Sequence, residues 1–398
     1  MTGLELVSQW FDSGQLVRPS VEAEDFLDLT RALACLSGIE DMCDGSKVEE
    51  LCREIGPADH YVFVLIDALG ADLVESLPQN AFLRVNMKRR LQSLFPSTTA
   101  SVLTSLATGM WPCSHGVSGW FMYLEEADIS VISLLFVERN TRRSLEELGL
   151  SAQDLFPVPS FWPYLRHEPH TVLPAAIVDS VYSNYSSGET QCLGYPDLSG
   201  AIEITSKLVL KASRPSLTYL YLPQFDETAH VKGKEHEQTR QILLTINEHL
   251  DELAKSLAGR VRIVISADHG VVTVPEERRF VLSGDDPLNR YLRCQPTGEP
   301  TVPVFHVHGG HEEAFTEEFT ERFGNHFALL LPEDAERLRL FGPGDLSPIT
   351  KSRLGSFIGI SRKPSVFYIR TKQKKGPVII GYHGGLSSEE MHVPLILV

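Results

Sequence analysis

Short apolar runs recur along the middle of the chain. The runs at 61–66, 216–222 and 261–267 are largely apolar, which is typical of strands buried on both faces of a parallel sheet. A charged segment with helical spacing lies between the second and third runs, at about 234–257. This alternation predicts an α/β fold with a doubly wound, mostly parallel sheet flanked by helices.

The pattern differs on either side of this alternation. Apolar positions from Phe26 to Ile39 have helical spacing, so residues 1–57 are predicted to form an N-terminal helical extension. After Val274, frequent Pro and Gly residues separate shorter elements. These elements are an amphipathic helix near 312–323 and strand-like pieces at 301–307, 327–331, 356–360 and 365–369. We therefore expect a catalytic core at 58–274 and 379–398, with an inserted α+β cap at 275–378.

Three aspartates follow the three apolar runs. Asp67 and Asp268 come directly after the first and third runs, and Asp226 lies shortly after the second. In doubly wound sheets, ligand-binding groups collect beyond the carboxyl ends of the strands. An aspartate at a strand end can also cap the following helix, but the recurrence at three strands favours a shared site.

Histidines accompany these aspartates. His230 lies four residues after Asp226, a spacing that places both side chains on one face of a helix, and His269 is adjacent to Asp268. His383 stands in the glycine-rich segment GYHGG, where the backbone can turn tightly. Each histidine alone could be incidental, but mixed Asp and His ligands suit zinc.

A run of hydroxyl residues provides a nucleophile candidate. Pro96 precedes Ser97, Thr98 and Thr99, and a helix is predicted from about Ala100 to Thr108. A hydroxyl at this boundary would lie near the positive end of the helix dipole, where phosphate is favoured. The alternative interpretation is that these residues only cap the helix.

Taken together, the motifs resemble the alkaline phosphatase superfamily, and within it the type I phosphodiesterase/nucleotide pyrophosphatase branch. The resemblance runs from about residue 60 to the C-terminus. It depends on five motifs in order: Asp67; Thr99 with TGMWPCSHG; Asp226 with His230; Asp268 with His269; and His383 followed by GGLSSEEMHVPL.

The resemblance implies two divalent metal ions, zinc or alternatively manganese, and a threonine nucleophile. One ion would be bound by Asp226, His230 and His383. The other would be bound by Asp67, Asp268 and His269.

The family spacing places the nucleophile at Thr99, with Thr98 as the alternative. The implied mechanism is in-line attack on phosphorus, followed by hydrolysis of a phosphothreonine intermediate.

The sequence departs from the family at Val102, where many members carry an asparagine that binds a phosphoryl oxygen. A backbone N–H group at the helix start is the expected replacement. The sulfatase motif is absent from the sequence. The resemblance therefore implies hydrolysis of phosphodiester or pyrophosphate bonds in small, nucleotide-like substrates. The alternatives are a phosphomonoesterase, a phosphonate hydrolase or a catalytically silent metal-binding relative.

Candidate substrate contacts follow the nucleophile segment. No Lys or Arg occurs between Thr99 and Glu138, which favours a diester over the more highly charged monoester. Trp120, Phe121 and Tyr123 could stack on a nucleobase, although such aromatic residues more often serve packing. Lys232 could supply a positive charge from another loop.

Three histidines of the predicted cap, His306, His308 and His311, form a further group. The alternation of His306 and His308 makes a third metal site conceivable. A polar strand face at the surface of the cap is the favoured interpretation.

Composition narrows the class of partner. The formal net charge of −16 argues against polymeric nucleic acid, while a small phosphorylated substrate remains compatible because bound metals reverse the local charge. No window is apolar enough to span a membrane, and the composition predicts no oligomeric state.

The N-terminus lacks a basic and an apolar region typical of a signal peptide, so a cytoplasmic protein is expected. The cysteines show no CxxC pair and are expected to be reduced. They are Cys35, Cys43, Cys52, Cys113, Cys192 and Cys294.

Overall fold

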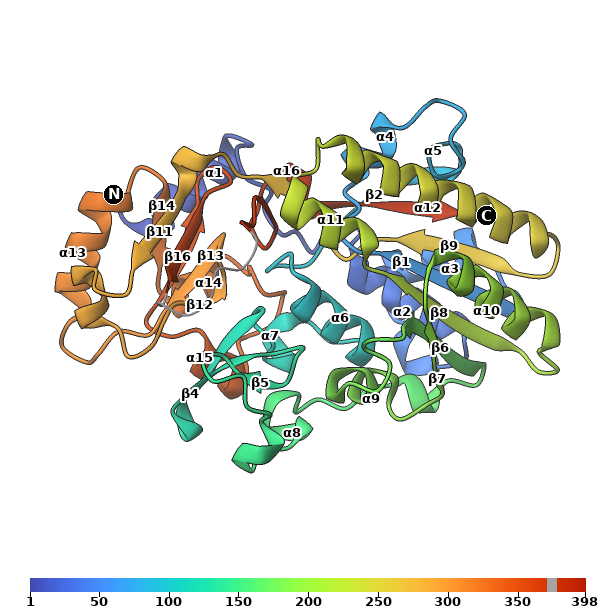
Figure 1. Cartoon of the computed structure of the whole chain (residues 1–398), viewed down its shortest axis with the longest axis horizontal. Helices are drawn as coiled ribbons and strands as arrows, with labels where there is room; N and C mark the ends of the chain where they lie inside the picture. Colours follow the sequence, from blue (N-terminus) through green and yellow to red (C-terminus); the bar gives the residue numbers. More distant parts are fainter. Residues whose placement is uncertain (371–377) are drawn as a thin grey trace.

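The computed structural model, which describes residues 1–370 and 378–398, contains two seven-stranded sheets (Figure 1). The central sheet has the order β2-β18-β9-β1-β8-β6-β7. Its strands are β1 (His60–Ile66), β2 (Met87–Gln92), β6 (Glu168–Pro174), β7 (Cys192–Tyr195), β8 (Ser216–Leu222), β9 (Arg262–Ser266) and β18 (His392–Leu397). The five neighbouring strands from β9 to β7 are parallel, and β18 is antiparallel to both of its neighbours.

Helices cover both faces of the central sheet, as the sequence predicted (Figure 1). On one face α2 (Phe26–Leu36) packs with α3 (Ser46–Ile55) and α6 (Thr99–Thr108). The helix α10 (Leu198–Lys211) packs against β6 and β8, and α12 (Glu237–Ser256) packs against α10. Every residue of β8 is buried, because helices take both sides of this strand away from water.

The second sheet is antiparallel throughout and has the order β14-β15-β13-β12-β3-β4-β5. Its strands are β3 (Phe121–Leu124), β4 (Ile129–Ile132), β5 (Val137–Glu138), β12 (Thr297–Glu299), β13 (Val302–Phe305), β14 (Phe327–Leu330) and β15 (Phe357–Ser361). A single residue pair, Gly298 with Phe121, joins β12 to β3. The sheet therefore combines two segments that are far apart in the sequence.

The strands predicted at 301–307, 327–331, 356–360 and 365–369 are confirmed by β13, β14, β15 and β16 (Val366–Arg370), and the predicted helix at 312–323 by α13 (Glu312–Phe323). The boundaries of the predicted cap stay a prediction, and residues 371–377 of it lie outside the described residues.

The remaining elements are short. Two small sheets pair β10 (Val272–Thr273) with β17 (Gly381–Tyr382), and β11 (Arg279–Ser283) with β16. The remaining α-helices are α1 (Gly3–Asp12), α4 (Ala71–Ser76), α5 (Phe82–Asn86), α7 (Pro112–His115), α8 (Ala152–Leu155), α9 (Val181–Ser187), α11 (Gln224–Lys232), α14 (Pro332–Arg337), α15 (Pro348–Arg353) and α16 (Ser388–Met391). No helix among the described residues has the length and apolar character needed to cross a bilayer.

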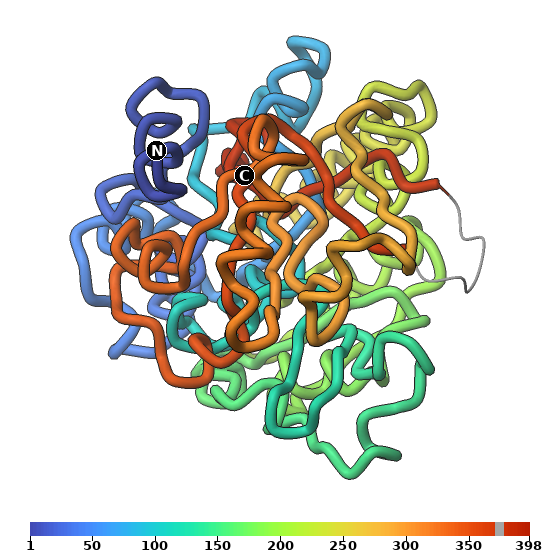
Figure 2. Tube along the Cα trace, turned by 90° about the vertical axis from the view of Figure 1, so that its left-hand side faces the viewer, coloured from blue at the N-terminus to red at the C-terminus, as the bar shows by residue number. Residues whose placement is uncertain are grey.

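The N-terminal helices pack on two different parts of the molecule. Val7 and Trp10 of α1 are buried in the core of the second sheet, together with Leu330 of β14. Figure 2 views the molecule from this side, where the N-terminal segment lies beside the second sheet. In contrast, Phe26 of α2 belongs to the core of the central sheet and packs near Phe63 of β1, with ring centroids 6.4 Å apart.

The expectation that all cysteines are reduced is wrong for one pair. Cys35 at the end of α2 and Cys43 form a disulfide, with Cα atoms 5.0 Å apart. The turn after α2 brings the two thiols together, although their spacing matches no sequence motif. Disulfides are uncommon in cytosolic proteins, and the cytoplasmic location stays a prediction.

Candidate metal and nucleophile site

Six predicted metal ligands converge at the carboxyl edge of the central sheet. Asp67 directly follows β1, Asp268 lies two residues after the end of β9, and Asp226 lies in α11, which begins just after β8. Within each of two groups, the candidate ligand atoms lie within 4.8 Å of one another. The groups are Asp226, His230 and His383, and Asp67, Asp268 and His269. The fold thus brings together residues that are up to 316 positions apart, counted from Asp67 to His383, which follows β17.

The two groups adjoin through their histidines. In α11 the four-residue spacing places His230 Nε2 3.1 Å from Asp226 Oδ2. His383 follows β17 and lies between the groups: its ring centroid is 3.8 Å from that of His269 and 5.1 Å from that of His230. The arrangement is a continuous cluster of carboxylates and imidazoles.

Backbone carbonyls determine which nitrogen each histidine offers. Nδ1 lies 2.7 Å from the Gly381 oxygen in His230, 2.9 Å from the Gly270 oxygen in His269 and 3.3 Å from the Ser97 oxygen in His383. A carbonyl can only accept, so Nδ1 carries a proton in each ring and Nε2 is the nitrogen that can bind a metal ion. This is the tautomer required of a metal-binding histidine whose other nitrogen is held by a backbone carbonyl.

The aspartates carry unsatisfied oxygens. Oδ1 of Asp67, Oδ1 of Asp226 and Oδ2 of Asp268 are buried and have no hydrogen-bond partner among the described residues. Burial, together with the charges of Asp268 and Asp226, raises the pKa of Asp67 well above its ordinary value. Buried carboxylates this close repel one another unless a cation lies between them. These side chains therefore fit as ligands of divalent metal ions, and their mixture of oxygen and nitrogen ligand atoms suits zinc or manganese.

Part of the negative charge is balanced within α11, by the ion pair between His230 and Asp226. Burial would lower the pKa of His230, but the Asp226 carboxylate outweighs this effect and raises it to about 9. The same ion pair holds the pKa of Asp226 below its ordinary value, although burial opposes this. At Asp268, burial outweighs the opposing effects of His269 and of two backbone N–H groups, so the pKa of this carboxyl group is raised.

Thr99 is the first residue of α6, one position earlier than predicted, and its hydroxyl faces the cluster. Its Oγ1 lies 3.1 Å from His269 Nε2. The Thr98 hydroxyl points elsewhere and donates to Oε1 of Glu299 at 2.6 Å. Between the two candidate nucleophiles, the geometry favours Thr99.

Glu299 was missed by the sequence analysis. This buried residue of β12 accepts hydrogen bonds from the Thr98 hydroxyl and, at 2.7 Å, from the Trp120 N–H group. Burial raises its pKa to about 7. Gly384, next to His383, has φ +114°, and a Cβ there would lie 2.7 Å from the Glu299 Cβ. No local pattern marks Glu299, because its partners precede it by about 200 positions.

Tyr221 was also missed. It lies in β8, which the sequence analysis treated only as a strand, and its hydroxyl donates to Oδ2 of Asp67. The alternation of residues in SLTYLYL directs Tyr219 and Tyr221 to the same face of the sheet. This alternation was the one available signal.

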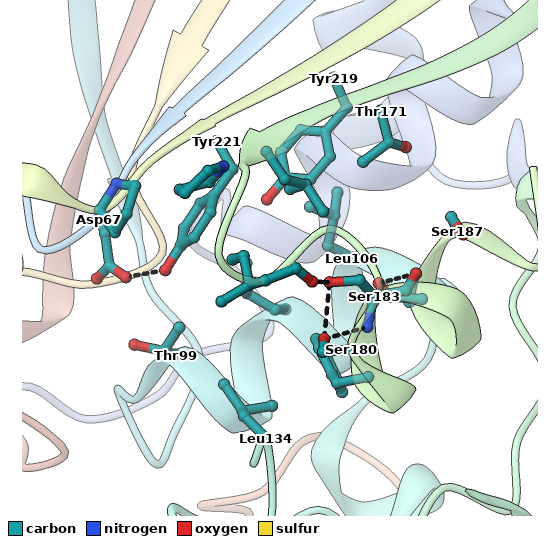
Figure 3. Close-up of a pocket in the computed structure, with 18 of the residues that line it drawn as sticks. Asp67, Thr99, Leu106, Leu134, Thr171, Ser180, Ser183, Ser187, Tyr219 and Tyr221 are labelled. Atoms are coloured by element: carbon teal, nitrogen blue, oxygen red, sulfur yellow. Dashed lines mark hydrogen bonds between the residues drawn. The ribbon is translucent and has the colours of Figure 1, made fainter. Parts of the chain in front are cut away.

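A cavity of about 400 Å³ opens beside Thr99 and extends between α6, α9, β6 and β8 (Figure 3). Thr99, Asp67 and Asp226 are among the residues that line it. Of the predicted substrate contacts, Trp120 lines this cavity.

The other predicted contacts lie elsewhere among the described residues. The guanidinium of Arg139 lies 3.8 Å from the Phe121 ring centroid, and the Tyr123 hydroxyl donates to Asp128 at 2.6 Å. Lys232 lines a separate, more open groove between α11 and α12.

The cap histidines do not share a surface face. His308 and His311 are exposed, but His306 is buried, with Nε2 2.9 Å from the Thr297 hydroxyl and its ring 4.8 Å from that of Tyr123. The predicted polar surface strand is therefore wrong for His306. Tyr123 of β3 packs against it, and the pairing of β3 with the cap strand β12 was not visible in the sequence.

Sequence comparison identifies the family. A family model described as type I phosphodiesterase/nucleotide pyrophosphatase matches residues 61–386, so the chain belongs to this family, within the alkaline phosphatase superfamily. This is a family of hydrolases that act on phosphoesters. Among curated protein sequences, no relative matches the chain significantly.

Solved structures agree on the fold. Murine ectonucleotide pyrophosphatase/phosphodiesterase 5 aligns with a TM-score of 0.62 and 17% identity over 84% of this chain and 87% of the murine chain. Its inactive form in complex with AMP has a TM-score of 0.61 at the same identity and coverage. Phosphonoacetate hydrolase from Sinorhizobium meliloti, in complex with phosphonoformate, aligns with a TM-score of 0.60 and 17% identity over 84% of this chain and 89% of the other.

Proposed function

We propose that this protein is a two-metal hydrolase that cleaves phosphodiester or pyrophosphate bonds of small substrates through a phosphothreonine intermediate. The observation that carries the proposal is the position of the Thr99 hydroxyl, 3.1 Å from Nε2 of His269 within a cluster of six metal-ligand candidates. Family membership supports the reaction class.

The proposal assigns one divalent ion to Asp226, His230 and His383, and a second to Asp67, Asp268 and His269. Zinc is the proposed metal and manganese the alternative. Bound there, such ions supply Lewis-acid stabilisation of phosphoryl oxygens and lower the pKa of a coordinated hydroxyl or water.

Thr99 performs the nucleophilic step. Its oxygen forms a bond to phosphorus while the bond from phosphorus to the leaving alcohol or phosphate breaks, and water then cleaves the phosphothreonine and restores the hydroxyl. Because Thr99 begins α6, the free N–H groups of the first turn face the same end of the helix. We assign to them the hydrogen bond that asparagine supplies in many relatives, since Val102 is apolar and buried.

The negative charge of the substrate decides between a diester and a monoester. A monoester carries more negative charge than a diester, and a cationic side chain is the usual partner for it. Among the described residues that line the cavity beside Thr99, none is Lys or Arg. The proposed substrate is therefore a small, nucleotide-like diester or pyrophosphate.

A substitution pair tests this proposal. Thr99→Ala in the zinc-loaded protein is expected to reduce kcat on bis-p-nitrophenyl phosphate by at least about a thousandfold. Metal content, measured by plasma mass spectrometry, is expected to stay unchanged. Thr98→Ala should retain most activity, and intact-mass analysis of quenched reactions should detect phosphorylated wild-type protein.

The outcomes separate the alternatives. Activity that survives in Thr99→Ala but not in Thr98→Ala would move the nucleophile by one residue. Faster turnover of p-nitrophenyl phosphate or phosphonoacetate would indicate a phosphomonoesterase or a phosphonate hydrolase. Full metal content without turnover of any of the three compounds would indicate a catalytically silent relative.

A further inference from the structure

Lys234 joins three segments of the chain that also carry candidate metal ligands. It is the second residue after α11 and lies four positions after His230. Its Nζ donates to Oδ2 of Asp72 at 3.0 Å and to Oε2 of Glu389 at 2.6 Å. We propose that Lys234 is a positioning residue that holds the ligand loops together and thereby raises the affinity for zinc. This inference rests on the metal site proposed above.

The two carboxylates that bind this lysine belong to the segments of different ligand candidates. Asp72 lies in α4, five residues after Asp67. Glu389 lies in α16, six residues after His383. The ammonium group therefore connects the segment of His230 with the segments of one ligand from each metal group.

The backbone of α16 contacts the loop that carries His269. The N–H group of Gly270 donates to the carbonyl oxygen of Glu390 at 2.9 Å. A Cβ at Gly270 would lie 1.9 Å from the carbonyl oxygen of Glu389, and a Cβ at Gly70 would lie 3.0 Å from the same atom. The loops after β9 and β1 thus lie directly against α16, and a displacement of α16 would move both of them.

The side chain of Glu390 fixes the loop after His383. This buried carboxylate accepts hydrogen bonds from the Gly385 N–H group at 2.8 Å and from the Ser387 hydroxyl at 2.6 Å. The short helix α16 therefore contacts the ligand loops after β1, β9 and β17. Lys234 connects it to α11, which carries the two remaining ligand candidates.

Burial distinguishes this ion-pair network from an ordinary surface ion pair, which contributes little to stability. The side chain of Lys234 is 11% exposed, whereas that of Lys255, which forms an ion pair within α12, is 73% exposed. Burial would lower the pKa of Lys234, but the carboxylates of Glu389 and Asp72 outweigh this effect and raise it. The Lys234 N–H group also donates to the Thr273 hydroxyl at 3.0 Å, so the backbone is fixed as well.

Loss of the ammonium group would leave two carboxylates facing each other. The oxygens of Asp72 and Glu389 both lie within hydrogen-bond distance of the same nitrogen atom. Without its charge they would repel each other and separate α4 from α16. Groups that orient metal ligands from outside the coordination sphere change metal affinity by about ten- to a hundredfold. Separation of the ligand loops should therefore weaken zinc binding.

A matched pair of variants tests the proposal. In Lys234→Met, the Kd for zinc, measured by competition with a chromogenic chelator, should rise at least about tenfold. Lys255→Met makes the same change at the exposed ion pair of α12 and should leave the Kd unchanged. Lys234→Arg keeps the positive charge and should recover most of the affinity. Equal zinc affinity in the two methionine variants would overturn the proposal.

Zinc affinity also distinguishes positioning from a structural role. The Kd is measured on folded protein, so a variant that is only less stable would bind zinc as the wild-type protein does. The melting temperature of the chelated variants, measured by circular dichroism, reports stability separately. If Lys234→Met does not fold, Glu389→Gln removes one of the two ion pairs and takes its place. It should also raise the Kd for zinc, and an unchanged Kd would overturn the proposal.

Zinc titration needs no turnover, so it separates failure of this inference from failure of the proposed function. If no phosphoester is hydrolysed but Lys234→Met binds zinc more weakly than Lys255→Met, the proposed reaction is wrong and the positioning role stands. If phosphoesters are hydrolysed and the two variants bind zinc equally, only the positioning role is wrong. A wild-type protein that binds no zinc would overturn both.

Discussion

The central sheet and the second sheet meet at the site but contribute different kinds of residue. Five of the six candidate ligands follow strands β1, β8 and β9 of the central sheet, directly or through α11, and His383 follows β17. The second sheet contributes Glu299, which binds the Thr98 hydroxyl next to the nucleophile. The central sheet thus supplies most of the metal-ligand candidates, and the second sheet holds the segment that carries the nucleophile.

This difference follows from topology. Parallel strands end at one edge, so residues just beyond them converge regardless of their separation in the sequence. An antiparallel sheet built from two distant segments can place a side chain against the edge of another sheet, as Glu299 of β12 shows. Substitutions of the ligand candidates beyond the strands of the central sheet should therefore abolish activity. Substitutions in the second sheet should weaken activity or alter stability.

The largest effect is expected from removing metal. Dialysis against a chelator should lower turnover at least about a thousandfold, and zinc or manganese should restore it. Added zinc should also raise the melting temperature, because a bound cation relieves repulsion among Asp67, Asp226 and Asp268. Differential scanning fluorimetry measures this shift.

Asp268→Asn provides the matched comparison for the metal experiment. The substitution removes one charged ligand. Added zinc should therefore change the turnover and the melting temperature of this variant less than those of the wild-type protein. A chelated protein with full activity would show that the aspartate and histidine cluster has a structural role only.

The stability of the protein should depend on pH through His306, the buried histidine that directly follows β13 of the second sheet. Burial, with a further contribution from Arg293, lowers the pKa of His306 to about 4, from an ordinary value near 6.5. Between about pH 6.5 and about pH 4 the unfolded chain binds a proton that the folded protein does not, so stability falls as the pH falls. His306 should account for about 3 kcal/mol of the loss of unfolding free energy.

Urea unfolding at about pH 7 and about pH 4 tests this dependence. His306→Gln should lose less stability between these two pH values than the wild-type protein does. His308→Gln alters an exposed histidine of the same segment and should leave the pH dependence unchanged. Equal dependence in all three proteins would show that His306 is not held neutral by burial.

The same topological difference explains how much the sequence could reveal. The apolar runs and the aspartates that follow them are local patterns, so the fold class and the convergence of six ligand candidates could be predicted. Glu299 and the burial of His306 depend on pairing between 121–138 and 297–305, and no local pattern encodes such pairing. The cavity next to Thr99 was missed for the same reason, since its walls come from four separate elements.

Glu299 connects the two sheets and should give the smallest of these effects. Its Oε1 accepts from both the Thr98 hydroxyl and the Trp120 N–H group, and Trp120 lines the cavity beside Thr99. Glu299→Ala would leave both donors unpaired and free the loop before α6, so kcat should fall about tenfold, with unchanged metal content. Glu299→Gln keeps a carbonyl oxygen that can accept both bonds and should recover most of this loss.

Steady-state kinetics on bis-p-nitrophenyl phosphate distinguish the two variants. If glutamine were as damaging as alanine, the negative charge of Glu299 would matter more than its hydrogen bonds, and the second sheet would contribute to the electrostatics of the site as well as to its positioning.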